Sequence, residues 1–248
     1  MEAPQYDGPM RWLLLILSMG CARYDATYDV TLPADGVFDG FLDADRGDLS
    51  YDGFGPERSF EVQVTSWARG SSRSRAERRE AHNRFGASVD GEWLDVWGRS
   101  GVGRSGTDLA VSGPYVFNVE AITPRGTVRL SNVDGFHTVT ASRVEGVGVW
   151  GDVDALADGD GIDLEIYPYD GSIVRLETVG DGLTVALPWG LDYDLQVFAD
   201  PEYGYEVEDL GFQDLVLGPD YALGTTRTRS IRVTLLATGG VVTVREAR

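Results

Sequence analysis

GTVRLSNVDG (126–135) and HTVTASRVEG (137–146) open the stretch that decides the fold. Four related segments follow, GIDLEIYPYDG (161–171), SIVRLETVGDG (172–182), LTVALPWG (183–190) and VVTV (241–244). Short β-branched runs closed by glycine turns are typical of β-strands. In the strongest units a turn glycine is followed by two apolar residues spaced two apart. These units are Gly126-Val128-Leu130, Gly161-Ile162-Leu164, Gly182-Leu183-Val185 and Gly240-Val242-Val244.

The spacing of these units predicts how they pack. Successive turn glycines lie about ten residues apart, or about twenty for alternate ones. A unit this short cannot bury its own apolar side, so neighbouring units must stack. We therefore predict an all-β chain, a parallel β-solenoid (β-helix-like) of short glycine-punctuated repeats. A β-sandwich or barrel with the same strand spacing is the alternative. No helical pattern separates the repeat strands, which argues against a βαβ architecture.

The chain as a whole divides into four regions. With 248 residues, 42% of them hydrophobic, it can bury a core as one domain or two small ones. We assign 1–20 to a signal peptide and 21–36 to a tether or a first strand. Residues 37–115 form an N-terminal β region, and 116–248 form the repeat region. Within the N-terminal region we expect strands at 37–42, 48–51, 60–67 and 93–97, and we interpret the glycine-rich residues 97–114 as a flexible junction.

One segment breaks the β pattern. Residues 73–84 (RSRAERREAHNR) contain no Gly, Pro or Val, and Ser71 or Ser72 can cap them. We predict a single helix over about 72–85. This helix lies in an island of arginines on an otherwise acidic chain: Arg69, Arg73, Arg75, Arg78, Arg79 and Arg84. The island is either a solvated helix face or an anionic-ligand patch for acidic glycan or phosphate groups.

Charge and composition exclude several functions. The chain carries 40 acidic and 21 basic residues, a formal charge of −19, and no lysine. A lysine Schiff base, a lysine nucleophile and a GxxxxGK phosphate loop are therefore excluded. An acidic chain of this kind is a poor nucleic-acid binder, and an anionic membrane repels it as a whole. We predict no nucleic-acid partner.

The few cysteines and histidines exclude further chemistry. One cysteine rules out disulfide frameworks, cysteine-rich zinc sites and iron–sulfur clusters, and HExxH is ruled out because His82 and His137 lie far apart. We expect both histidines on the surface or in strands. GVGRSG (101–106) spells GxGxxG, but Gly113 and Pro114 would cut off the helix that a dinucleotide site needs, so we predict a surface loop. No cofactor is predicted.

The acidic stretch ADGDGIDLE (157–165) is a weak candidate for a calcium site. Asp158, Asp160 and Asp163 are clustered among glycines, as oxygen ligands for Ca²⁺ often are. Two known templates fail, since Leu156 would occupy the first EF-hand position and Glu165 stands where a calcium-binding nonapeptide repeat needs an apolar residue. We favour an acidic solvent turn.

An enzyme is the sharper alternative to a binding module. Several β-solenoids cleave polysaccharides with paired carboxylates, and some also need a basic group, for which Arg125, Arg129, Arg143 and Arg175 are candidates. An enzyme predicts converging acids and an arginine in one cleft, whereas a binder predicts a broad aromatic or arginine-lined face. Eight aromatic residues could form a sugar-stacking platform, although we expect most of them in the core or at the solenoid ends. They are Trp93, Trp97, Trp150, Trp189, Tyr167, Tyr169, Tyr203 and Tyr205.

The N-terminus indicates export. Arg11 precedes the apolar run Trp12–Leu17, which is too short to span a bilayer and ends in Ser18, Met19, Gly20 and Cys21. This segment resembles a bacterial lipoprotein signal with Cys21 as the lipidated first residue of the mature chain. Ordinary secretion, or a buried N-terminal strand with an inert Cys21, are the alternatives. A lipoprotein would be held at the membrane by its N-terminal acyl anchor.

The repeats also carry a family resemblance. LETVGDGLTVALP (176–188), VEGVGVWGDV (144–153) and LLATGGVVTV (235–244) look like the T-x-x-G-x-[IV]-x-[VL] rungs of the bacterial putative-adhesin family DUF4097. Gly47-Asp48-Leu49, followed by an apolar strand and a charged helix, is similar to that family's N-terminal half. The resemblance covers roughly residues 37–247 and implies a β-helix-like domain in an envelope setting, without catalytic residues.

Together these patterns predict a non-enzymatic lipoprotein of the cell envelope, in the outer membrane or periplasm, that binds or scaffolds an envelope protein or glycan. A secreted protein is the alternative location. A polysaccharide-active β-helix enzyme, or an accessory or sensor protein in the envelope stress response, are the alternative functions.

Overall fold

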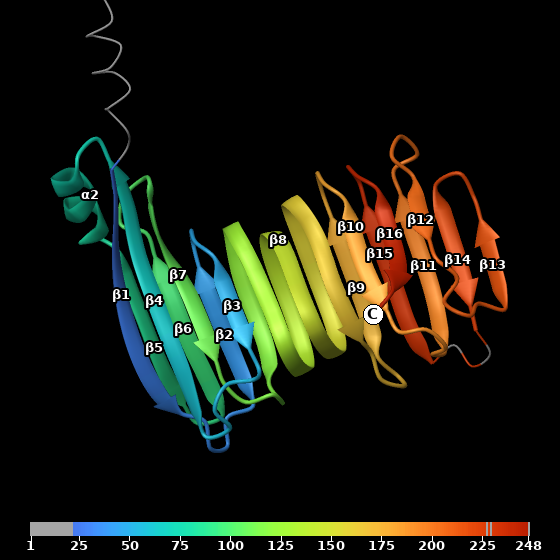
Figure 1. Cartoon of the computed structure of the whole chain (residues 1–248), viewed down its shortest axis with the longest axis horizontal. Coiled ribbons are helices and arrows are strands. Elements are labelled where there is room, and N and C mark those ends of the chain that lie inside the picture. Colours follow the sequence, from blue (N-terminus) through green and yellow to red (C-terminus); the bar gives the residue numbers. More distant parts are fainter. Residues whose placement is uncertain (1–21, 227, 229, 248) are drawn as a thin grey trace, which may run out of the picture.

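The chain folds into one large mixed sheet that does not close, with a short helix at one end (Figure 1). A computed structural model describes residues 22–226, 228 and 230–247. The predicted signal peptide and Cys21 lie outside these described residues. The strands follow one another along the long axis of the molecule, from β1 at one end to β13 at the other (Figure 1).

The strands of the N-terminal half are β1 (Ala22–Pro33), β2 (Asp39–Ala44), β3 (Leu49–Asp52), β4 (Ser59–Gly70), β5 (Arg84–Asp90), β6 (Trp93–Arg99) and β7 (Ser105–Ser112). Then come β8 (Asn118–Tyr167), β9 (Ile173–Thr178), β10 (Leu183–Leu187), β11 (Tyr193–Ala199) and β12 (Tyr205–Val207). The last strands are β13 (Asp214–Leu217), β14 (Tyr221–Thr225), β15 (Ile231–Ala237) and β16 (Val242–Glu246). The helix is α2 (Arg73–Glu80). Over the residues that the structure describes, the prediction of a mostly β chain with one short helix is confirmed.

The strands pair in two series, and β8 takes part in both. In the first series the order is β5, β6, β2 and β8, and from β8 it continues through β9, β15, β11, β14 and β13. In the second series the order is β1, β4, β7, β3 and β8, continuing through β10, β16 and β12. Buried residues of both series belong to a single hydrophobic cluster, so the two series share one core.

Strand β8 shows where the turn glycines of the repeats lie in the sheet. Its 50 residues pair successively, residues 118–122 with β2, 128–131 with β3, 153–157 with β9 and 162–165 with β10. The predicted glycine turns do not interrupt the strand. Gly135, Gly148, Gly151 and Gly161 lie inside it with positive φ, a conformation that glycine adopts without strain. The turns are therefore bends within a continuous ladder.

The repeat units stack in register. Leu183 of β10 pairs with Ile162 of β8 on one side and with Val242 of β16 on the other. Val185 continues the same arrangement one step along, and all these side chains are buried. The turn glycines stack as well, since a Cβ added to Gly161 would lie 2.3 Å from the carbonyl oxygen of Gly182. Stacking of neighbouring units thus buries the apolar positions that each unit alone leaves exposed.

Antiparallel strands lie at both ends of the parallel region. β1 pairs with β4 over its whole length, from Ala22 opposite Gly70 to Pro33 opposite Ser59, so residues 22–33 form a strand and not a tether. β4–β7, β5–β6, β11–β14 and β13–β14 are antiparallel too. An all-parallel arrangement was therefore the wrong expectation for these ends.

The region 97–114 also differs from its prediction. Instead of a flexible junction it contains the end of β6 and all of β7, whose Leu109 and Val111 are buried. The GxGxxG motif leads directly into β7. β7 pairs with β4 on one side and with β3 on the other, so this stretch is an integral part of the sheet.

Helix α2 is shorter than predicted. Ser72 is the N-cap, and its side chain accepts a hydrogen bond from the Arg75 amide at 3.3 Å. The helix ends at Glu80, so His82 follows it instead of lying on it. Asn83 joins this end to the sheet, because its Nδ2 donates to Ser66 Oγ and to the carbonyl oxygens of Trp67 and Gly106. In the described chain, no helix has the length and apolar character needed to cross a bilayer.

Candidate functional site: an aromatic hollow and a charged hollow

An open hollow with three aromatic rings lies on the outer side of β5, β6 and β2. Its volume is about 730 Å³, and its rings are Phe41, Trp93 and Trp97. The strands alternate inward and outward, so Leu94 and Val96 enter the core while Trp93, Asp95 and Trp97 point outward. The alternation of β6 thus places two tryptophans and a carboxylate on one surface.

The pairing register arranges rings and carboxylates in alternation. Trp93 lies opposite Asp39 on β2 and opposite Asp90 on β5. One step along, Asp95 lies opposite Phe41, and a further step brings Trp97 opposite Asp43. Every ring therefore has a carboxylate as its neighbour on the adjacent strand.

Two contacts fix the far end of this hollow. Gly86 of β5 lies opposite Trp97, and a Cβ there would come within 2.9 Å of the indole, so the ring rests on the backbone of β5. Arg99 is ion paired with Asp43 and donates to the carbonyl oxygen of Gly98 at 3.0 Å. The hydrogen bond that Arg99 donates to the Asp43 carboxylate raises the pKa of Arg99, which stays charged. Ring and guanidinium are thus held in place before any ligand arrives.

A smaller hollow of about 260 Å³ continues the same surface toward β8, and Trp93 lines both. It adds Phe136, whose side chain is 56% exposed. Within the smaller hollow, Asn118 joins two strands of the lining, since its Nδ2 donates to Asp39 Oδ1 at 2.7 Å and its Oδ1 accepts from the Phe136 amide at 2.8 Å. Flat apolar rings with hydrogen-bonding groups between them can stack on sugar rings and bind their hydroxyl groups.

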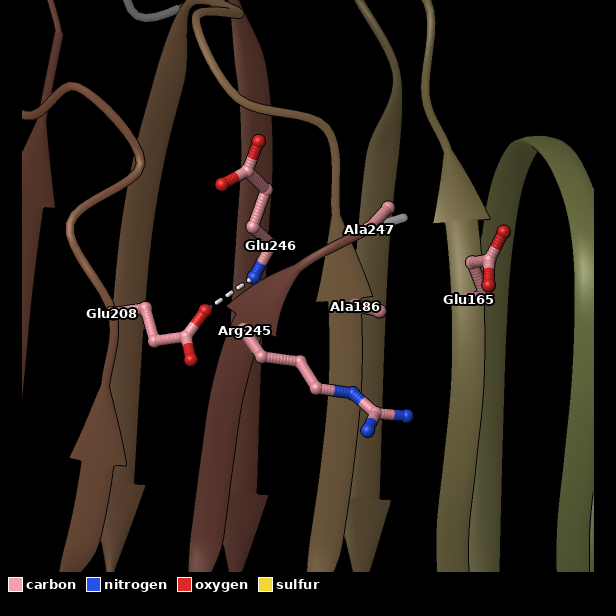
Figure 2. Close-up of a pocket in the computed structure, with 6 residues that line it drawn as sticks. All are labelled: Glu165, Ala186, Glu208, Arg245, Glu246 and Ala247. Atoms are coloured by element: carbon pink, nitrogen blue, oxygen red, sulfur yellow. Dashed lines mark hydrogen bonds between the residues drawn. The ribbon is translucent and has the colours of Figure 1, made fainter.

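A second hollow, of about 460 Å³, lies at the C-terminal part of the other series (Figure 2). Ala186 of β10 pairs with Glu165 of β8 on one side and with Arg245 of β16 on the other. Because the middle residue carries only a methyl group, a space opens between the acid and the guanidinium. Figure 2 shows the Arg245 side chain reaching across β10 toward the strand of Glu165.

Three charged side chains of this hollow, those of Glu165, Glu208 and Arg245, already have partners. Glu208 accepts a hydrogen bond from the Glu246 amide at 2.7 Å (Figure 2), and Arg245 lies 3.6 Å from Asp163. Glu165 accepts from the Tyr167 hydroxyl, a hydrogen bond that raises the pKa of Tyr167. Acids and an arginine do converge here, as a polysaccharide-active enzyme would require, but on an open surface with their polar groups engaged.

Most of the arginines proposed for catalysis lie in surface ion pairs. Arg129 contacts Asp48 at 3.1 Å and Glu145 at 2.9 Å, and Arg143 also contacts Glu145. Burial alone would raise the pKa of Glu145, but the hydrogen bonds from Arg143 and Arg129 outweigh it and lower the pKa. Arg175 contacts Glu177 at 3.3 Å, and Arg125 is exposed. Of these four arginines, only Arg129 lines an open hollow with acids, a space of about 580 Å³ whose charged lining residues are Asp52, Arg129, Glu145, Asp163, Glu165 and Arg245.

The calcium candidates do not form a ligand set. Asp158, Asp160 and Asp163 are exposed along β8, and Asp163 faces Arg245. Among the described residues, no group of three or more His, Cys, Asp or Glu side chains is arranged to hold a metal ion. His82 is exposed, while His137 is fully buried in β8, where burial lowers its pKa to about 4.

None of the eight aromatic residues considered for sugar stacking is fully buried, so the core, one of the two places expected for them, does not hold them. The buried aromatic rings are instead Tyr51, Phe60, Phe117 and Tyr193. Trp93, Trp189, Tyr169 and Tyr203 are exposed, and Trp97, Trp150, Tyr167 and Tyr205 are half-buried. Trp150 stacks on Tyr167 with 4.7 Å between ring centroids. Only Trp93 and Trp97 of the eight line the aromatic hollow.

Sequence reasoning missed several lining residues of both hollows. Phe41, Asp43, Asp95 and Arg99 belong to two alternating runs, F-x-D (41–43) and W-x-D-x-W-x-R (93–99), that are visible in the sequence. The period of two shows that the members of each run share one side of a strand. The meeting of Glu165, Glu208 and Arg245 has no such local signal, because it depends on which strands pair.

Comparison with known proteins gives a structural match. The fold is similar to that of a putative cell adhesion protein from Clostridium sporogenes, with a TM-score of 0.53 and 11% identity, over 90% of this chain and 100% of that chain. The likeness is one of fold. Putative adhesins from Bacteroides fragilis (TM-score 0.30, 10% identity, 89% and 97% covered) and Parabacteroides merdae (0.28, 8%, 90% and 97%) match more weakly. No family model and no curated protein matches the sequence.

Proposed function

We propose that this chain is a lipid-anchored, non-catalytic binding module of the bacterial cell envelope and that its aromatic hollow binds carbohydrate. The observation that carries the proposal is the alternation of Phe41, Trp93 and Trp97 with carboxylates on one open surface. A cluster of exposed rings is typical of a binding surface, and sugar rings offer a flat apolar side together with hydroxyl groups. The anchor is Cys21, proposed from the sequence.

We further propose that the sheet winds as a β-solenoid. The support is that β8 alternates between the two series, pairing with β2, β3, β9 and β10 in turn, and that its buried side chains share one core. In-register stacking of the turn glycines agrees with coils of similar length. The DUF4097 resemblance, which rests on the repeat residues, is part of the same proposal.

The carbohydrate proposal is tested by glycan-array screening followed by calorimetry on the best hit. Trp93→Ala should weaken binding at least about tenfold, since an anchoring aromatic is typically worth more than about 1.4 kcal/mol. Trp189→Ala is the matched control, because Trp189 is 63% exposed and lies outside the hollow. Equal losses in the two variants, or no glycan bound by the wild type, would refute the assignment.

If the chain were instead a polysaccharide-active enzyme, the charged hollow would be its candidate catalytic site. Bound polysaccharide should therefore also be assayed for new reducing ends. We expect none. Cleavage that is lost in Glu165→Gln or Arg245→Gln would favour a polysaccharide-active enzyme over a binding module.

A further inference from the structure

The arginine island of the N-terminal end is set beside the start of β1. Ala22, the residue after Cys21, pairs with Gly70, and Arg23 pairs with Arg69. Gly70 touches the helix, because a Cβ added there would lie 2.7 Å from the amide nitrogen of Ala76. Helix α2 packs on β1 and β4 at the end of the molecule where the described chain begins (Figure 1). Cys21 is therefore one residue from a strand that adjoins the helix.

The arginines of the island have no acidic partners. Across the described ranges, no ion pair joins Arg69, Arg73, Arg75, Arg78, Arg79 or Arg84 to a carboxylate. Elsewhere on the molecule, arginines that are ion paired include Arg23, Arg99, Arg129, Arg143, Arg175 and Arg245. With 40 acids against 21 bases, carboxylates are abundant. Residues 69–84 contain six arginines and only two acids, Glu77 and Glu80, so this segment is a local exception to the charge of the whole chain.

The island is also exposed and held in shape. Arg69, Arg73, Arg75, Arg78 and Arg84 are exposed, and Arg79 is half-buried. Arg79 donates to the carbonyl oxygen of Arg69 at 2.7 Å, and Arg75 donates to Ser71 Oγ at 3.1 Å. The remaining donors of these guanidinium groups face solvent, where an arriving phosphate group could accept them.

We propose that this arginine island docks on the anionic headgroups of the membrane that holds the chain through Cys21. The proposal rests on the lipid anchor of the proposed function. Charge complementarity identifies the partner, since phosphate headgroups are anionic and the rest of the protein is repelled by them. The position of Ala22 explains why the island would meet that surface first. Docking would fix the α2 end of the molecule on the membrane.

The test uses the full chain with Cys21→Ser, so that no acyl group holds it to lipid. Co-sedimentation is measured with vesicles of phosphatidylglycerol mixed with phosphatidylcholine and with vesicles of phosphatidylcholine alone. The neutral vesicles report any binding by the apolar N-terminal run. Arg73→Gln/Arg75→Gln/Arg78→Gln removes three charges from the island. The matched control, Arg58→Gln/Arg125→Gln/Arg232→Gln, removes three exposed charges elsewhere.

We expect binding to the anionic vesicles that salt weakens. The island variant should lower the partition coefficient about a hundredfold, because each of the three arginines removed contributes about fivefold near an anionic surface. The control variant should lower it little. Equal losses in both triple variants, or no preference for anionic vesicles, would overturn the proposal. So would binding of an acidic polysaccharide through the island when the vesicles are not bound.

Lipid anchoring at Cys21 is tested separately, by the intact mass of the wild-type protein extracted from membranes. An unmodified Cys21 together with island-dependent vesicle binding would refute the anchor and leave the docking surface standing. An acylated Cys21 without island-dependent binding would refute the docking surface alone.

Discussion

Replacing Gly161 with alanine tests the stacked turns of the repeat region directly. Gly161 has a φ of +86°. Its added Cβ would lie 2.3 Å from the carbonyl oxygen of Gly182 on the next unit. Gly171 is the matched control, because its φ of +91° is similar but nothing lies within 4 Å of an added Cβ. The two variants share the backbone strain and differ in the contact between units.

The expected losses of stability follow from the backbone strain and from the contact with the Gly182 carbonyl. The left-handed conformation costs an alanine about 1–2 kcal/mol, and this is the whole loss for Gly171→Ala. Relieving the overlap with the Gly182 carbonyl requires a backbone shift, which adds about 1–3 kcal/mol for Gly161→Ala. Urea unfolding followed by circular dichroism gives both losses. Equal free energies of unfolding in the two variants would show that the turns do not stack as described.

Three further variants test other parts of the fold. Because His137 is neutral and buried in the folded chain, its imidazole binds a proton more readily in the unfolded chain. The free energy of unfolding should therefore fall as pH falls from about 6.5 toward about 4, by about 3 kcal/mol in total. Over that pH range the urea midpoint should drop less in His137→Leu than in the wild type. Identical pH profiles of the two proteins would contradict this. Asn83→Ala removes four hydrogen bonds that join the segment after α2 to the sheet and to the loop at Gly101. Its free energy of unfolding, measured in the same assay, should fall by about 2 kcal/mol or more. The control is the exposed neighbour, and His82→Ala should lose about 0.5 kcal/mol or less. Ser72→Ala should lower the free energy of unfolding by about 1 kcal/mol through loss of the helix cap, and an unchanged value would argue against that cap.

The repeat spacing predicted much of the strand content because it reports local backbone preference. Val128, Leu130, Ile162, Leu164, Leu183 and Val185 are buried, as a period of two with stacked units requires. Direction was harder to predict. Nothing local distinguishes β4, which runs antiparallel to its neighbours, from the parallel strands, because both bury alternate residues. The end of α2 was misjudged because RSRAERREAHNR has no breaker after Glu80, where Asn83 instead bonds to the sheet.

The candidate site was only partly visible in the sequence. Trp93 and Trp97 were identified as sugar-stacking candidates, but none of the eight aromatic candidates fills the core, which was one of the two places expected for them. Small residues explain this, because Ala44, Ala121, Ala141, Ala155 and Ala157 occupy inward positions that leave little room for large rings. The charged hollow could not have been predicted. Glu165, Ala186 and Arg245 lie far apart along the chain and meet only through the pairing register of their strands.

The central claim is that the chain is a binding module tethered to the cell envelope through Cys21. Intact-mass measurement of the protein extracted from membranes, beside a Cys21→Ser variant, tests it most directly. The account predicts a wild-type mass that lacks residues 1–20 and carries acyl chains, in the membrane fraction, with the variant unacylated. A soluble wild-type chain with residues 1–20 retained and Cys21 unmodified would contradict the envelope assignment.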